Sequence, residues 1–129
     1  MLDHVGIPVS DYERSKAFYS KVLKPLGYEL VFEVSSTETG GKRQAGFGTG
    51  KSPQFWIGTG KTIKGGQAHI AFVAKSRDAV RGFYDAAMKA GGSDNGAPGL
   101  RPHYHENYFG AFVLDPDGQN IEAVCRLAE

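Results

Sequence analysis

The strongest constraint on the fold of this 129-residue chain is an internal repeat with a period of 65 residues. Both copies run in the same order: alternating strand-like residues, a helix-capping residue, an amphipathic helix and a glycine that ends the helix. Such a repeat indicates two copies of one supersecondary unit. Over residues 4–27, the pairs that are identical under this shift are His4 and His69, Phe18 and Phe83, Tyr19 and Tyr84, Lys24 and Lys89, and Gly27 and Gly92.

In the first copy, apolar residues alternate over residues 3–9 and predict a strand. Ser10 and Glu13 have the spacing of a capping box, so we expect Ser10 to be the N-cap of a helix that is closed by Gly27. The strands expected to follow are 28–35, 43–48 and 54–58, with a hairpin turn at 39–41.

The second copy predicts the same elements again. Ser76 is the expected N-cap of a helix that ends at Gly91 and Gly92. The segment 115–118, Asp-Pro-Asp-Gly, is typical of a type I turn, and it joins expected strands at 108–114 and 120–125. Residues 93–102 are rich in glycine and proline, so we expect a loop there.

The repeat therefore predicts an α+β fold of two βαβββ modules. We expect a single domain, with one module over about residues 1–62, the other over about 66–129, and residues 59–66 as the linker.

The composition limits the classes of partner that the sequence favours. The formal net charge is +1 and no run of like charges occurs, so the sequence favours neither nucleic acid nor an anionic membrane as a partner. No apolar stretch approaches the roughly 20 residues of a membrane span. Cys125 is the only cysteine, so no internal disulfide can form, and we expect a reducing, cytoplasmic location.

Strand parity picks out three candidate metal ligands. His4, His69 and Glu122 each lie on the strand face opposite to the apolar residues that face a helix. Two imidazoles and one carboxylate are the ligand set of a facial triad, which binds a divalent cation and leaves positions open for substrate. The alternative is ordinary polar lining, because an isolated inward-facing His or Glu is commonly only hydrogen-bonded or solvated.

A second candidate group lies on the segment 101–108. His103 could act as a general base near neutral pH, and Tyr104 and Arg101 could contact a substrate, since loops commonly carry specificity. The alternative is a polar surface loop with no such role.

Several segments together resemble the glyoxalase/bleomycin resistance/dioxygenase family, also called the vicinal oxygen chelate superfamily. They are 4–9, 18–19, 25–28, 69–72 and, most specifically, 115–122. The resemblance implies that His4, His69 and Glu122 are the metal ligands, with Glu122 also taking part in catalysis. It further implies that the two βαβββ modules form a curled mixed sheet around a cleft. The cleft would hold one divalent ion (zinc, nickel, manganese or iron) and a small-molecule substrate, and the protein would be a homodimer.

One position departs from a branch of that family. Glyoxalase I enzymes carry a further ligand glutamate on the last strand of the first module, where parity places Trp56 in this chain. Tryptophan can neither ligate a metal nor abstract a proton, so we interpret Trp56 as a wall of the substrate cleft or as simple packing. Isomerisation of methylglyoxal is therefore not supported.

The resemblance leaves several functions open. We expect a glyoxalase-like, divalent-metal-dependent enzyme of the lyase or isomerase type that acts on a small oxygenated substrate. The alternatives are a drug-sequestering binding protein without turnover, an extradiol-type dioxygenase or a thiol transferase. Fosfomycin-resistance thiol transferases carry a threonine at the position of Gly6, so fosfomycin is not supported as the substrate.

Overall fold

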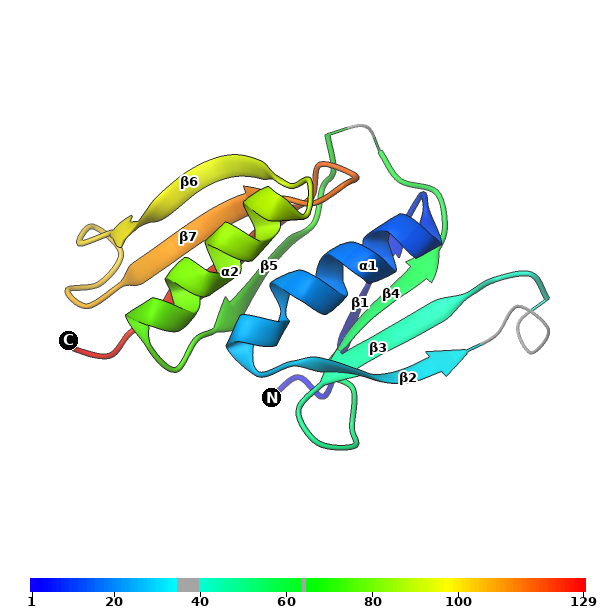
Figure 1. Cartoon of the computed structure of the whole chain (residues 1–129), viewed down its shortest axis with the longest axis horizontal. Helices are drawn as coiled ribbons and strands as arrows, with labels where there is room; N and C mark the ends of the chain where they lie inside the picture. The colour runs from blue at the N-terminus through cyan, green and yellow to red at the C-terminus, as the bar shows by residue number, and fades with distance from the viewer. Residues whose placement is uncertain (35–39, 64) are drawn as a thin grey trace.

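The computed structural model describes residues 1–34, 40–63 and 65–129, and it contains the βαβββ unit twice (Figure 1). The first unit consists of β1 (Val5–Val9), α1 (Tyr12–Val22), the 3₁₀ turn η1 (Lys24–Leu26), β2 (Glu29–Val34), β3 (Gln44–Gly48) and β4 (Phe55–Thr59). The second consists of β5 (His69–Val73), α2 (Arg77–Lys89), β6 (Ser93–Leu100), β7 (Phe109–Leu114) and β8 (Asn120–Cys125).

The two units have the same sheet topology, which confirms the α+β duplication. Each is a four-stranded mixed sheet, with the order β1-β4-β3-β2 in the first and β5-β8-β7-β6 in the second. The first and last strands of each unit are parallel, and all the other pairs are antiparallel. Because strand parity is the same in both sheets, equivalent residues point to equivalent faces.

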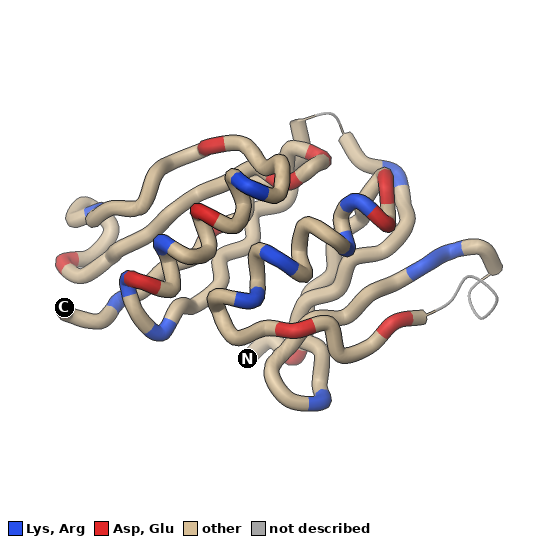
Figure 2. Tube along the Cα trace, viewed as in Figure 1, with Lys and Arg blue, Asp and Glu red and all other residues tan. Residues whose placement is uncertain are grey.

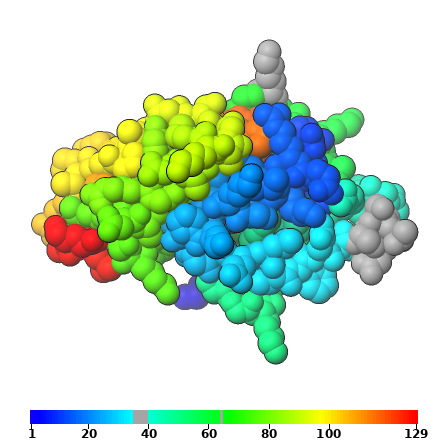
Figure 3. All heavy atoms as spheres, viewed as in Figure 1, coloured from blue at the N-terminus to red at the C-terminus, as the bar shows by residue number. Residues whose placement is uncertain are grey.

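One face of each sheet is covered by its helix, and the two helices also contact each other (Figures 1 and 3). Phe18 of α1 and Phe83 of α2, which are repeat equivalents, are 2% and 0% exposed. Phe55 and Phe72 come from different sheets and pack edge to face, with ring centroids 5.2 Å apart. One continuous core therefore joins the two modules and leaves the opposite sheet faces uncovered by helices.

The N-cap of α1 differs from the prediction. Asp11, and not Ser10, caps the helix, and its side chain accepts a hydrogen bond of 3.1 Å from the Arg14 backbone N–H. The Ser10 hydroxyl instead donates to the carboxylate of Asp117 in the second module. A partner 107 residues away thus redirects the side chain that the local pattern assigned to the cap. Ser76 caps α2 as predicted, through the Ala79 N–H.

The expected loop at 93–102 is also wrong, because Ser93–Leu100 is strand β6. This strand lies at the edge of its sheet, pairs with β7, and changes register on both sides of Gly96. Glycine and proline are tolerated at edges and bulges, where fewer ladder hydrogen bonds are needed. The signal that favoured a loop therefore marks an irregular edge strand.

The predicted turn at 115–118 is confirmed, because the Gly118 N–H donates to the Asp115 carbonyl at 2.9 Å. Part of the hairpin turn predicted at 39–41, and Ser35 at the end of its preceding strand, lie outside the described residues.

The turn at 115–118, together with Gln119 just after it, joins the second module to the first through hydrogen bonds. The buried Tyr19 hydroxyl of α1 donates to Asp115 Oδ2 at 2.6 Å. The Ser10 backbone N–H donates to Asp117 Oδ2 at 3.1 Å, and Gln119 Nε2 donates to the Pro8 carbonyl at 3.1 Å. Asp115 and Tyr19 are almost fully buried, so these polar contacts belong to the joint core of the two modules.

Charges of both signs are interspersed along the described chain (Figure 2). Among the described helices, none is long and apolar enough to cross a bilayer.

Candidate functional site

On the uncovered face of the second sheet, two of the predicted ligands come together. His69 begins β5 and Glu122 lies on β8, and register places both on the same side of the sheet. His69 Nε2 is 3.1 Å from Glu122 Oε1. The Glu122 side chain is 3% exposed, whereas that of His69 is 52% exposed. The pair is therefore a buried carboxylate with an imidazole at its solvent rim.

Tyr108, which the sequence analysis did not select, holds the other carboxylate oxygen. Its hydroxyl donates a hydrogen bond to Glu122 Oε2. A Cβ atom at Gly110 would lie 3.1 Å from the Tyr108 ring and 3.4 Å from the Glu122 carboxylate, so glycine makes room for this contact. Burial raises the pKa of Tyr108 to about 12, and the hydrogen bond to Glu122 adds to the shift. The phenol is therefore a protonated donor at neutral pH.

The loop that carries the second candidate group continues from Tyr108. The Tyr104 ring packs edge to face on Tyr108 with centroids 5.1 Å apart, and the His103 ring lies 4.2 Å from Tyr104. Arg101 Nη2 donates to the Ala97 carbonyl at 2.8 Å. The structure thus places His103 and Tyr104 in one chain of contacts that leads to the buried carboxylate.

His4, in contrast, lies at the start of β1 in the first sheet. Its Nδ1 is 2.6 Å from Asp3 Oδ1, and both side chains are largely exposed. In the part of the chain that the structure describes, no three His, Cys, Asp or Glu side chains lie close enough to hold a metal ion. One chain therefore brings together His69 and Glu122 but not His4.

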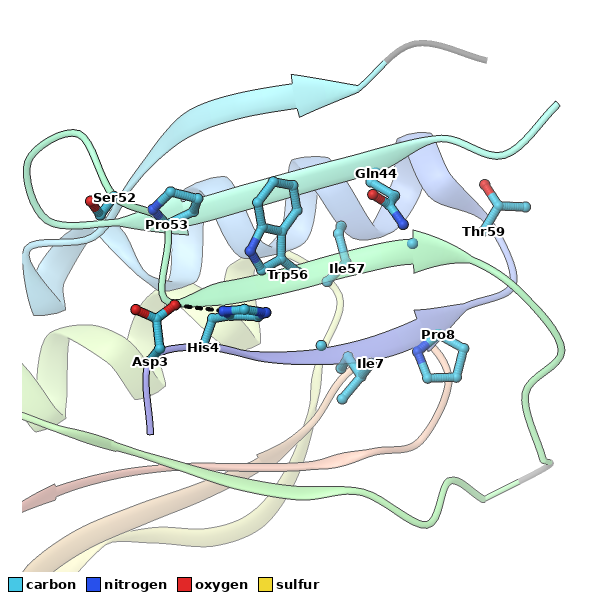
Figure 4. Close-up of a pocket in the computed structure, with 12 residues that line it drawn as sticks. Asp3, His4, Ile7, Pro8, Gln44, Ser52, Pro53, Trp56, Ile57 and Thr59 are labelled. Atoms are coloured by element: carbon cyan, nitrogen blue, oxygen red, sulfur yellow. Dashed lines mark hydrogen bonds and ion pairs between the residues drawn. The ribbon is translucent and has the colours of Figure 1, made fainter. Parts of the chain in front are cut away.

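His4 instead borders a pocket of about 780 Å³ on the uncovered face of the first sheet (Figure 4). Trp56 of β4 lines this pocket, together with Pro53, Gln44 and Pro8. Sequence parity had placed Trp56 on this face, and its partly exposed indole is available to a ligand.

The sheet register shows that Trp56 and Glu122 are equivalent positions. Trp56 pairs with Gly6 on β1, and Glu122 pairs with Ala71 on β5. Gly6 and Ala71 are related by the 65-residue shift that relates His4 to His69. The carboxylate of one module is therefore replaced by an indole in the other.

A family model described as the glyoxalase/bleomycin resistance protein/dioxygenase superfamily matches residues 1–123. The chain belongs to this superfamily. No curated protein gives a significant match to the sequence.

Solved structures of the superfamily share the fold along the whole chain. A glyoxalase/bleomycin resistance protein from Albidiferax ferrireducens T118 is 28% identical, with a TM-score of 0.75 over 97% of this chain and 98% of the other. Glyoxalase I from Zea mays is 22% identical, with a TM-score of 0.72 over 96% of this chain but only 45% of its own. The fosfomycin resistance protein FosX from Listeria monocytogenes is 17% identical, with a TM-score of 0.68 over 97% and 92%. At these two lower identities, the likeness concerns the fold alone.

Proposed function

We propose that this protein is a divalent-metal-dependent enzyme of the glyoxalase-like type that acts on a small oxygenated substrate. The observation that supports this most directly is the pairing of His69 with the buried carboxylate of Glu122. A carboxylate that is 3% exposed is costly to keep ionised unless a cation or strong donors compensate it.

The donor set fits a divalent ion. Imidazole nitrogen and carboxylate oxygen suit zinc, nickel, manganese or iron. His69 Nε2 and Glu122 Oε1 lie 3.1 Å apart on the same side of the sheet, so these two atoms would hold the ion. When bound, the ion would polarise a substrate oxygen as a Lewis acid.

His4 is proposed as the third ligand, supplied by a second copy of the chain in a homodimer. Its side chain is 60% exposed and that of His69 is 52% exposed, so both are accessible to another subunit. His4 directly precedes β1 and His69 begins β5, and both strands are edge strands of their sheets.

The remaining groups act on the substrate and on the ligands. Tyr108 holds Glu122 in place through its hydroxyl. His103 is proposed as the general base, and Tyr104 and Arg101 as substrate contacts at the rim. Trp56 is proposed as a wall of the substrate pocket.

Metal analysis of the purified protein tests the proposal. After supplementation with zinc, nickel, manganese or iron in turn, we expect about one ion per chain, and we expect His69→Ala and Glu122→Ala to lose it. His105→Ala, which removes a loop histidine, is the matched control and should retain the ion. A parent protein that takes up no metal, or ligand variants that bind metal like the parent, would reduce the site to polar lining.

Metal analysis of the purified protein before supplementation distinguishes the candidate chemistries. Iron that co-purifies would favour dioxygen chemistry, whereas zinc, nickel or manganese would favour isomerisation or thiol transfer. The other candidate is a binding protein without turnover, and the Trp56 pocket favours it because its lining lies on the sheet that lacks Glu122.

A further inference from the structure

We propose that the pocket around Trp56 binds an uncharged, planar aromatic group. Every lining residue comes from the first module, so the pocket does not depend on the His69–Glu122 pair. The inference rests on the proposed function only where it treats this ligand as part of the substrate.

The shape of the pocket depends on glycines beside the indole. Gly6 and Gly46 are the register neighbours of Trp56 on the two adjoining strands. A Cβ atom at Gly46 would lie 3.1 Å from the Trp56 ring and 2.7 Å from Pro53, so a side chain there would displace the indole. A Cβ atom at Gly6 would lie 3.4 Å from Trp56 Cβ, which is ordinary contact. A side chain could therefore fit at position 6, and the glycine there leaves a space beside the indole that the packing of the sheet does not require.

The Trp56 indole on β4 bounds this space on one side. Phe32 on β2 supports the indole from its other side, across Gly46, with ring centroids 6.0 Å apart, and it remains 54% exposed. Pro8 on β1 lines the pocket beyond Gly6 (Figure 4). Flat backbone beside an indole suits a planar ring, since aromatic groups pair by offset stacking or edge-to-face contact.

The side chains of the lining themselves favour an uncharged ligand over an anion. In the described lining, Asp3 and His4 are the titratable side chains, and they face each other at 2.6 Å. No lysine or arginine is present in that described lining to pair with a carboxylate or a phosphate. Gln44 and Ser52 supply uncharged polar groups that could meet a hydroxyl or a carbonyl. The ligand that fits is therefore neutral and aromatic, with one or more polar substituents.

Trp56 is the only tryptophan of the chain, so its fluorescence reports on this pocket alone. The probes are 4-nitrobenzyl alcohol and 4-nitrobenzoate, which share a ring and differ in charge. We expect saturable quenching by the alcohol and at least about tenfold weaker binding of the benzoate. Calorimetry with cyclohexanemethanol, which lacks the aromatic ring, should give at least about tenfold weaker binding than the alcohol.

Gly6→Val fills the space without backbone strain, because residue 6 is an exposed strand position with φ outside the left-handed region. We expect Gly6→Val to bind the alcohol at least about tenfold more weakly than the parent does, with an unchanged circular dichroism spectrum. Ala97→Val, an equally exposed strand position in the second sheet, is the matched control and should bind like the parent.

The titrations are run on the protein as purified and again after dialysis against a chelator. Binding that survives chelation supports the pocket even if metal analysis contradicts the proposed enzyme. Non-saturable quenching, equal affinity for the two nitro probes, equal affinity for the cyclohexyl alcohol, or Gly6→Val behaving like Ala97→Val would each overturn the proposal.

Discussion

Trp56 in the first sheet and Glu122 in the second occupy the same place in two copies of one fold, but they have opposite surroundings. Trp56 lies between Gly6 and Gly46, partly exposed, at the side of an open pocket. Glu122 lies between Ala71 and Phe112, almost fully buried. The backbone ladder decides that both point away from the helices, whereas the neighbouring residues decide whether the side chain is buried or borders a pocket.

This difference divides the work between the modules. The second sheet offers the His69–Glu122 pair with Tyr108 behind it, and the first offers shape and aromatic surface. Duplication thus supplies two similar frames, and substitution at a few positions gives their uncovered faces different side chains. Five measurements would sharpen or break this comparison.

The largest expected effect concerns the carboxylate that Trp56 replaces. A glyoxalase I reaction needs a base beside the bound substrate, and the loss of a general base costs about 10²–10⁴ in rate. We therefore expect turnover of the methylglyoxal–glutathione adduct to be slow or absent, in a spectrophotometric assay with zinc, nickel, manganese or cobalt supplied in turn. The pocket also lacks a described lysine or arginine to bind the anionic glutathione moiety.

Two results would contradict this expectation. Fast turnover that disappears in His103→Ala would show that the loop histidine replaces the missing glutamate. Fast turnover that persists in His103→Ala would show that Trp56 does not occupy the position of the catalytic glutamate, although the register pairs it like Glu122.

The next effect concerns the hydrogen bond between Tyr19 and Asp115, which joins the two modules. Tyr19→Phe removes the hydroxyl that donates to Asp115 Oδ2 and leaves a buried carboxylate with one partner fewer. We expect the free energy of unfolding to fall by about 1–3 kcal/mol in urea titrations at pH 7. Tyr84→Phe, the repeat equivalent in α2, is the matched control and should cost less.

The same bond predicts the pH dependence. Burial, followed by the nearby Asp115 carboxylate, raises the pKa of Tyr19 well above its usual value. The unfolded chain therefore loses this proton first, so the contribution of Tyr19 is complete below about pH 10 and is lost as the pH rises above it. Tyr19→Phe should show a shallower loss of stability between about pH 9 and 11, and an unchanged slope would contradict the assignment.

A smaller effect is expected at the buried carboxylate itself. Tyr108→Phe keeps the ring and removes the hydroxyl that holds Glu122. If Glu122 is a ligand, we expect metal affinity measured by calorimetry to fall about tenfold, because groups that orient ligands contribute at this scale. Tyr84→Phe serves again as the control. Unchanged affinity with a lowered melting temperature would make Tyr108 a purely structural partner.

The smallest effects concern the two helix caps. Asp11→Ala and Ser76→Ala each remove a side chain that accepts a first-turn N–H, and each should cost about 1 kcal/mol in the free energy of unfolding. An unchanged chemical denaturation midpoint in Asp11→Ala would contradict the observed cap. Ser10→Ala does not test the cap, because it also removes the hydrogen bond to Asp117.

These comparisons also show how far local pattern reaches. Alternation predicted that His69, Glu122 and Trp56 lie on the uncovered faces, because side-chain direction in a strand depends only on parity. The strand β6 was missed because its pairing comes from β7 and not from its own glycine- and proline-rich composition. The role of Tyr108 was missed because its bond to Glu122 spans two strands and is only possible beside Gly110.

The sequence by itself determined the duplication, the α+β class, the family resemblance and the faces on which the polar groups lie. Each of these follows from periodicity or from a motif within a few neighbouring residues. Only the tertiary structure decided that Ser10 turns to Asp117, that Tyr19 holds Asp115, and that His69 reaches Glu122 while His4 stays on the other sheet. The first two outcomes depend on how the two modules pack, and the third depends on which strands pair within each module. The atoms that these contacts join are 50 to more than 100 residues apart, which no local period specifies.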